Sequence, residues 1–184
     1  MEKATAILAL PSEGLALFRR GLGALCLLDA CLRLPTAVFW LTDLGVLPRS
    51  LYFRLFENSL SWSVFAISGR PEFAFCLLIL MAVLGASQLA GRSQRWVRVA
   101  LWILALSVQN RNPALLEASD YLLRILLFWD VFLPQSSQVQ RDITSAFTLG
   151  LQLQLSVASG ALAWYLTESG WRQAAAWSLS SRAF

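Results

Sequence analysis

The chain has 184 residues, of which 57% are hydrophobic and 14% are charged, and its formal net charge is +4. Soluble domains carry about 45–50% apolar and about 25% charged residues, so this composition excludes an ordinary soluble domain and predicts an integral membrane protein. The sequence contains no histidine, which excludes a His-ligated haem, a His-metal centre and a Ser-His-Asp triad. Its basic residues fall mostly at the ends of apolar runs, as membrane anchors do, so no nucleic-acid role is expected.

Five apolar runs predict transmembrane helices, arranged as an all-α bundle that forms one domain over residues 1–184. In chain order the predicted spans are about 15–41, 72–90, 96–109, 115–133 and 143–166. Turn-forming or helix-breaking residues separate them, namely Gly45, Gly91, Pro113 and Pro134. The stretch 49–70 mixes aromatic, apolar and charged residues, which favours short helices at the membrane interface.

The arginine distribution predicts a cytoplasmic amino terminus, because basic residues are enriched in short loops on the cytoplasmic side. The residues expected on that side are Lys3, Arg19, Arg20, Arg92, Arg95, Arg98 and Arg141. Those expected on the opposite side are Arg49, Arg54, Arg70, Arg111, Arg172 and Arg182. The pattern fits a bacterial inner membrane and a photosynthetic or other organellar membrane equally well.

Two predicted spans carry charged residues at one-turn spacing. Asp29 and Arg33 lie four residues apart, as do Asp120 and Arg124, so each pair shares a helix face and is expected to form an ion pair. Glu117 lies one turn before Asp120. Ionised groups at bilayer depth are costly unless paired or hydrated, so both faces are expected to turn inward. The structural interpretation is an ion-pair network that fixes helix register, and the functional one is a polar cavity or a proton path.

Other polar and aromatic residues have simpler interpretations. Asp130 is expected at the interface, and Gln152 and Gln154 are expected to bond neighbouring helices. The tryptophans near span ends, which predict an aromatic belt, are Trp40, Trp62, Trp96, Trp129 and Trp171. The three cysteines, Cys26, Cys31 and Cys76, include no Cys-x-x-Cys pair, so they predict small buried hydrophobes and no metal site.

Short motifs recur along nearly the whole chain. In order they are Arg19, Asp29-x-x-x-Arg33, the run from Thr42 to Arg49, Arg111-Asn112-Pro113, Asp120-x-x-x-Arg124, the run from Trp129 to Pro134, the run from Leu151 to Leu155, Ser159-Gly160 and Trp171-Arg172. In content and order they resemble the horizontally transferred transmembrane (HTTM) domain family, which includes the vitamin K-dependent gamma-glutamyl carboxylase. The resemblance implies a helical membrane core with a motif loop made by Asp43, Pro48, Arg49, Arg111 and Asn112.

The resemblance does not extend to the chemistry of that carboxylase. There, an element like Ser159-Gly160 leads within a few residues to a lysine that acts as the base on reduced vitamin K, and a histidine assists. Ala163 stands about where the lysine is expected, and Lys3 is the only lysine. A methyl group cannot take a proton, so the chain is not expected to be an enzyme of this kind. It also ends before the further helices and the lumenal domain of the carboxylase, which predicts a truncated core or a fragment.

Three functions are compatible with these features. The first is a non-catalytic accessory or structural subunit of a larger membrane complex, which packs against other spans and holds lipid, quinone or pigment between helices. The second is a small-molecule or lipid-binding membrane enzyme or transporter that uses the Asp/Arg faces as a polar site. The third is a helper in peptide maturation, suggested by bacterial members of the family. The expected partners are membrane lipid and other membrane subunits.

Overall fold

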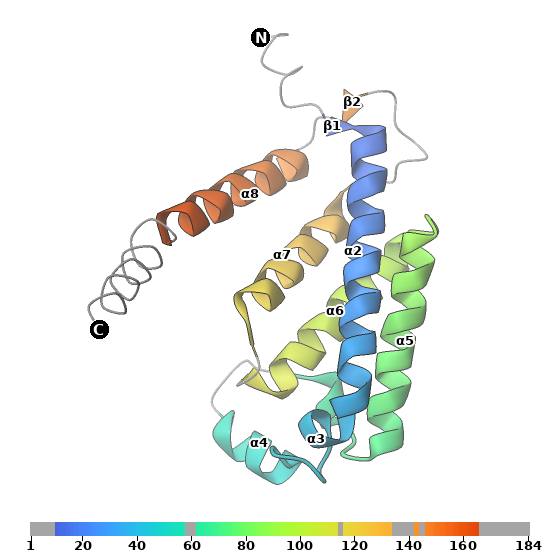
Figure 1. Cartoon of the computed structure of the whole chain (residues 1–184), viewed down its shortest axis with the longest axis vertical. Coiled ribbons are helices and arrows are strands. Elements are labelled where there is room, and N and C mark those ends of the chain that lie inside the picture. The colour runs from blue at the N-terminus through green and yellow to red at the C-terminus, as the bar shows by residue number, and fades with distance from the viewer. Residues whose placement is uncertain (1–9, 58–61, 114–115, 134–141, 144–145, 166–184) are drawn as a thin grey trace, which may run out of the picture. The chain divides into compact units, whose positions relative to one another are not determined.

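The computed structural model describes residues 10–57, 62–113, 116–133, 142–143 and 146–165 (Figure 1). The chain divides into two compact units, and each is considered by itself. The larger unit is Leu10–Ile143, and the described part of the other is residues 146–165. Several residues named above lie outside the described part of the chain: Lys3, Pro134, Arg141, Trp171, Arg172 and Arg182.

The described residues of the larger unit are helical apart from turns and one short antiparallel strand pair. In chain order its elements are β1 (Leu10–Pro11), α2 (Ser12–Arg33), a 3-10 turn (Leu34–Thr36), α3 (Ala37–Leu41), α4 (Arg49–Leu55), a second 3-10 turn (Val64–Ala66), α5 (Pro71–Leu89), α6 (Arg95–Arg111), α7 (Ala118–Phe132) and β2 (Asp142–Ile143). Leu10 on β1 pairs with Ile143 on β2. The prediction of an all-α fold is confirmed at this level.

Proline and glycine set several of these boundaries. Pro35 has no backbone N–H to continue the α-helical ladder, and α2 gives way to the 3-10 turn there. Pro71 opens α5, where its missing N–H would be unpaired in any case. At the other end of α5, Gly91 has φ 84°, the left-handed conformation that closes a helix and that glycine adopts without strain.

Two helical segments among the described residues are long and apolar enough to cross a membrane. They are Glu13–Leu41, with 29 residues, and Pro71–Leu89, with 19 residues. Helices α6 and α7 also coincide with predicted spans, but they have 17 and 15 residues. At a rise of about 1.5 Å per residue these are shorter than the roughly 30 Å hydrocarbon core. Among the described residues, two of the five predicted spans therefore lie in segments of spanning length.

The core of the larger unit lies where α2 and α5 pack against each other and against α6 and α7 (Figure 1). Helices α2 and α5 approach closely at two glycines. A Cβ atom on Gly23 would lie 2.6 Å from the backbone nitrogen of Leu89, and one on Gly85 would lie 2.9 Å from the carbonyl oxygen of Gly23. Small residues allow such backbone contact between helices.

The predicted burial of the cysteines is right for one of the three. Cys26 lies in the core with no exposed surface. Cys31 and Cys76 are exposed, because they point away from the α2/α5 contact, so the prediction for these two is wrong.

Helix α8 (Ala146–Tyr165) belongs to the smaller unit. Leu151 is buried, Gln152 and Gln154 are half-buried, and the Ser156 hydroxyl donates to the Gln152 carbonyl oxygen over 2.8 Å. Ala163, which stands where the carboxylase lysine is expected, is exposed.

Candidate functional site

Three polar clusters lie inside the larger unit. We name them the buried cluster (Arg19, Gln88, Arg98 and Asp130), the groove cluster (Asp29, Arg33, Glu117 and Asp120) and the loop cluster (Asp43, Arg49 and Arg111). Seven of the ten sequence-predicted site residues fall in the last two clusters, and Arg124, Pro48 and Asn112 lie outside them. The members of the buried cluster were not among the predicted residues.

The buried cluster joins four helices around one carboxylate. Arg19 Nε on α2 lies 2.9 Å from Asp130 Oδ1 on α7, and Gln88 Nε2 on α5 donates to Asp130 Oδ2 over 3.0 Å. Arg98 Nη1 on α6 lies 3.8 Å from Asp130 Oδ1. Asp130 and Gln88 have no exposed surface, and Arg98 is 2% exposed. Asp130, which was predicted to be interfacial, is therefore enclosed by protein and does not face solvent.

The cluster contains two guanidinium groups and one carboxylate, and the carboxyl end of α7 supplies the remaining acceptors. Arg98 Nη1 donates to the carbonyl oxygens of Asp130 and Leu133 over 2.7 and 2.9 Å, and Arg19 Nη2 donates to Leu133 over 3.0 Å. The last carbonyls of a helix lack intrahelical partners and carry about half a negative charge. The end of α7 therefore helps to neutralise the second arginine.

Each polar member continues the apolar stripe of its own helix. On α2, Arg19 falls in one row with the buried residues Leu15, Leu22, Cys26 and Ala30. On α6, Arg98 falls in one row with Leu101, Ala105 and Val108. This register is the signal in the sequence that could have identified both residues as buried.

Because Arg19 and Arg98 are buried, fewer arginines are exposed than the predicted membrane orientation of the chain assumes. Arg19 and Arg98 were expected at the headgroups but are 3% and 2% exposed. Among the described residues, the exposed arginines on the side expected to be cytoplasmic are Arg20, Arg92 and Arg95, whereas Arg54 and Arg70 are exposed on the other. The cytoplasmic amino terminus stays a prediction.

In the groove cluster, Arg33 bridges two helices. Its Nε lies 2.7 Å from Asp29 Oδ1 on the same helix, and its Nη2 lies 2.8 Å from Asp120 Oδ1 on α7. The second oxygen of Asp120 accepts the backbone N–H of Glu117, and these two residues form a capping box at the start of α7. The two acidic faces that the sequence identified thus meet through one arginine.

The predicted pair between Asp120 and Arg124 does not form. Arg124 Nε donates instead to Gln109 Oε1 on α6 over 2.7 Å, and Arg124 also lies over the Tyr121 ring at 5.5 Å. Gln109 Nε2 in turn donates to the Asp120 carbonyl oxygen over 2.9 Å. Arg33 pairs with the Asp120 carboxylate from the neighbouring helix α2. The spacing of residues along α7 alone cannot predict a partner on another helix.

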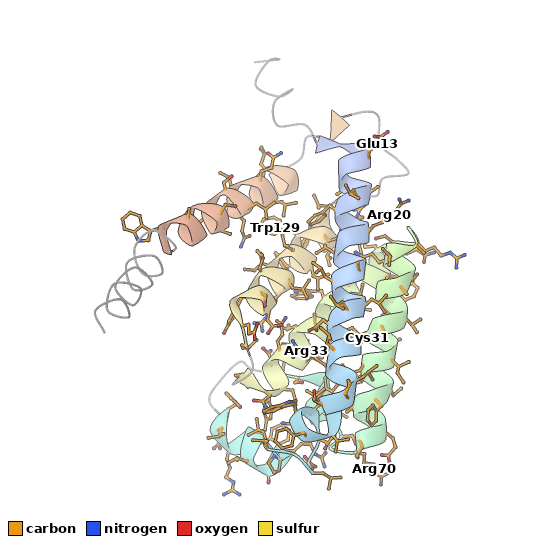
Figure 2. The ribbon with its side chains drawn as sticks, viewed as in Figure 1. Glu13, Arg20, Cys31, Arg33, Arg70 and Trp129 are labelled. Carbon is orange, nitrogen blue, oxygen red and sulfur yellow. The ribbon has the colours of Figure 1, made fainter. Side chains whose placement is uncertain are left out.

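A groove opens between α2 and α7 beside this cluster. Its apolar part has a volume of about 370 Å³, and an adjoining polar part has about 380 Å³. Asp29, Leu32, Ser119 and Asp120 line both parts, so the two are continuous. Figure 2 shows Arg33 on α2, at the polar part.

The groove cluster lies at the depth of the middle of α5. Helices α2 and α5 run antiparallel, and Leu27 lies against Gly85 (Figure 1). The next turns of α2, which carry Asp29 and Arg33, are therefore level with the central turns of α5. If α5 spans the bilayer, these charges lie near its midplane, where ionised groups are rare and mark polar sites or structural pairs.

The loop cluster joins three motifs that lie far apart in the sequence. Asp43 accepts the backbone N–H of Arg49 over 2.8 Å and pairs with Arg49 Nε over 2.7 Å. Arg111 Nη2 lies 3.8 Å from Asp43 Oδ1, and its guanidinium lies 5.3 Å from the centre of the Tyr52 ring. A Cβ atom on Gly69 would overlap the Asp43 carboxylate at 1.8 Å, so a larger residue there would displace this carboxylate from its present position.

The remaining motif residues support this loop. The Pro48 carbonyl accepts the N–H groups of Leu51 and Tyr52 at the start of α4. Asn112 ends α6 and is 5% exposed. Arg111 is fully buried, and none of its three side-chain nitrogens has a hydrogen-bond partner among the described residues. Its electrostatic stabilisation therefore depends on Asp43 and on the face of Tyr52.

A pH dependence follows for Asp43. Burial raises the pKa of its carboxyl group, but hydrogen bonds from Arg49 and the charges of Arg49 and Arg111 outweigh burial and hold the pKa below its usual value. A lowered pKa contributes stability that is present above the unfolded pKa of about 3.9 and is lost as pH falls through the folded value. Asp43→Asn should therefore cost up to about 1 kcal/mol at neutral pH, since the pair is partly exposed.

The measurement is the thermal midpoint of both proteins between neutral and acid pH in mild detergent. The difference between wild type and Asp43→Asn should be constant above the unfolded pKa and shrink below it. The exposed Glu57, changed to Gln, is the control and should show little difference at any pH. A difference for Asp43→Asn that grows with acidity would contradict the assigned direction.

Comparisons of the chain with protein-family models, curated proteins and solved structures find no match. The chemistry of the clusters is thus the remaining guide to function. Among the described residues, no three His, Cys, Asp or Glu side chains are placed to hold a metal ion.

Proposed function

We propose that this chain is a non-catalytic accessory subunit of a larger membrane complex. The observation that carries the proposal is the uncovered apolar surface of its two segments of spanning length. Within the most apolar stretch of each segment, only 28% is buried in Glu13–Leu41 and 39% in Pro71–Leu89. The core helix of a soluble protein is mostly buried, and this low burial supports a setting in which lipid or other spans cover these faces.

The exposed faces are large and continuous along each helix. On α5, Ile79 is 53% exposed, Leu80 44% and Val83 59%. On α2 the exposed large apolar side chains are Leu17, Leu25, Leu28 and Leu32. Neighbouring membrane subunits and lipid both fit such surfaces. We further propose that α6 and α7 lie within the membrane beside these two segments, and that α8 is itself a membrane helix, in keeping with the five spans predicted from the sequence.

The paired charges support a non-catalytic role. Asp130 has partners on three other helices, and Asp120 has partners for both of its oxygens. Groups that neutralise one another in this way fix helix register and are poorly suited to exchanging protons. The exposed Ala163 offers no base.

We also propose that the chain has an HTTM-like core. The support is spatial: motifs that are separate in the sequence come together in two places. Arg33 of one motif meets Asp120 of another, and Asp43 meets both Arg49 and Arg111.

The test is gentle detergent extraction of the full chain from its native membrane, followed by native gel separation and mass spectrometry. We expect a stable assembly with fixed stoichiometry. Val83→Trp, on the exposed face of α5, should weaken that assembly without loss of folded chain, because it alters only the outer surface. Leu44→Trp is the matched control, since Leu44 is 76% exposed and lies outside both spanning segments. Migration of the wild-type chain alone would overturn the proposal.

A further inference from the structure

The groove cluster carries more negative than positive charge. Three carboxylates, on Asp29, Glu117 and Asp120, line the polar part of the groove, and Arg33 supplies the one guanidinium that lines it. Arg124 does not restore the balance, because its guanidinium faces Gln109 and Asn110 on α6. With all four groups ionised, the groove has a formal excess of two negative charges.

Asp29 offers an unfilled acceptor atom where the two parts of the groove meet. Asp29 Oδ1 accepts Arg33 Nε, but no described residue donates to Asp29 Oδ2. The Asp29 side chain is 22% exposed, and it lines both the apolar and the polar part of the groove. Asp120 differs, since both of its oxygens already accept hydrogen bonds. Of the two aspartates that line both parts of the groove, Asp29 is therefore the one with an oxygen left to accept a donor from a ligand.

The other part of the groove is a hydrocarbon surface. Leu25, Leu28 and Leu32 on α2 are 49%, 56% and 68% exposed, and leucines of α7 face them. Its volume of about 370 Å³ lies within the range of about 300–1,000 Å³ typical of small-molecule sites. An apolar groove that ends at a carboxylate suits a ligand with a hydrocarbon chain and a head group that donates hydrogen bonds.

We propose that this groove binds one single-chain amphiphile with a cationic amine head. The ammonium group donates to Asp29 Oδ2 and offsets the excess negative charge, while the chain lies along the exposed leucines of α2 and α7. An anionic head would add to the excess charge, and a hydroxyl head would leave it unbalanced. The proposal does not require the accessory role, but it assigns Leu25, Leu28 and Leu32 to the bound ligand and leaves the other exposed residues of α2 and α5 to neighbouring subunits.

The experiment uses the full chain in mild non-ionic detergent and native mass spectrometry. The probes are octadecylamine, stearate and octadecanol, which share one chain length and differ in head charge. We expect one octadecylamine to be retained per chain at concentrations where stearate and octadecanol are not. Asp29→Asn should weaken amine retention about tenfold or more, the loss of one charge-assisted hydrogen bond, while the Arg33–Asp120 pair stays in place.

A second variant tests the apolar part without touching the charges. Leu28→Trp should fill the apolar part of the groove and abolish retention of octadecylamine. Leu17→Trp, at a 72% exposed position of α2 outside the groove, should leave this retention unchanged. Equal retention of all three probes, or equal retention by wild type and Asp29→Asn, would overturn the proposal. So would an absence of amine binding by the folded wild-type chain. Thermal unfolding of each variant establishes that it is folded.

Discussion

Replacing Asp130 with asparagine is expected to lower the free energy of unfolding by about 3–5 kcal/mol, the cost of leaving buried charges without their partner. Asp130 is fully buried and lies 2.9 Å from Arg19 Nε and 3.8 Å from Arg98 Nη1. Asparagine has nearly the same size, so the change removes the charge and leaves the packing in place. Two guanidinium groups would then have only neutral acceptors in the cluster, namely the amide oxygen of the new asparagine and the carbonyls at the end of α7.

The loss can be measured by detergent denaturation followed by tryptophan fluorescence, for which the chain has eight tryptophans. Glu13→Gln is the control, because it removes a carboxylate from an exposed position of α2. The double variant Arg19→Met with Asp130→Leu should recover part of the loss, since it removes one buried charge of each sign. Equal stability of Asp130→Asn and Glu13→Gln would show that the buried cluster does not stabilise the fold.

Gly21 and Gly23 both lie on α2, and changing each to alanine should alter the free energy of unfolding in opposite directions. Gly23→Ala should destabilise the chain by about 1–3 kcal/mol, because its Cβ would lie 2.6 Å from a backbone atom of α5, which cannot move aside like a flexible side chain. Gly21→Ala should stabilise it by up to about 1 kcal/mol, since nothing lies within 4 Å of its Cβ and alanine is the better helix former.

The same denaturation measurement decides this prediction, and the two variants serve as each other's control. Both substitutions add one methyl group to α2, two residues apart, so helix propensity favours both equally. Only contact with α5 distinguishes them. A Gly23→Ala protein as stable as Gly21→Ala would mean that the close approach of α2 and α5 is not maintained in detergent.

Local chemistry allowed much of the helical arrangement to be predicted. Apolar runs located α2, α5, α6, α7 and α8, and proline and glycine located several of their ends, because these effects act over a few residues. The pair between Asp29 and Arg33 was also predictable, since residues four apart on a helix are neighbours. The lengths of the individual helices were less predictable: α7 has 15 residues where residues 115–133 were predicted, and α6 has 17 where residues 96–109 were predicted.

The sequence by itself thus determined an apolar helical chain with charges placed inside its helices. The tertiary structure alone decided which charges meet. Arg33 rather than Arg124 pairs with Asp120, and Arg19 and Arg98 leave the expected headgroup positions to surround Asp130. Spacing along one helix fixes only the face on which a side chain lies. Its partner depends on which other helix packs against that face and at what level, and the contact of Gly23 with α5 helps to set that level.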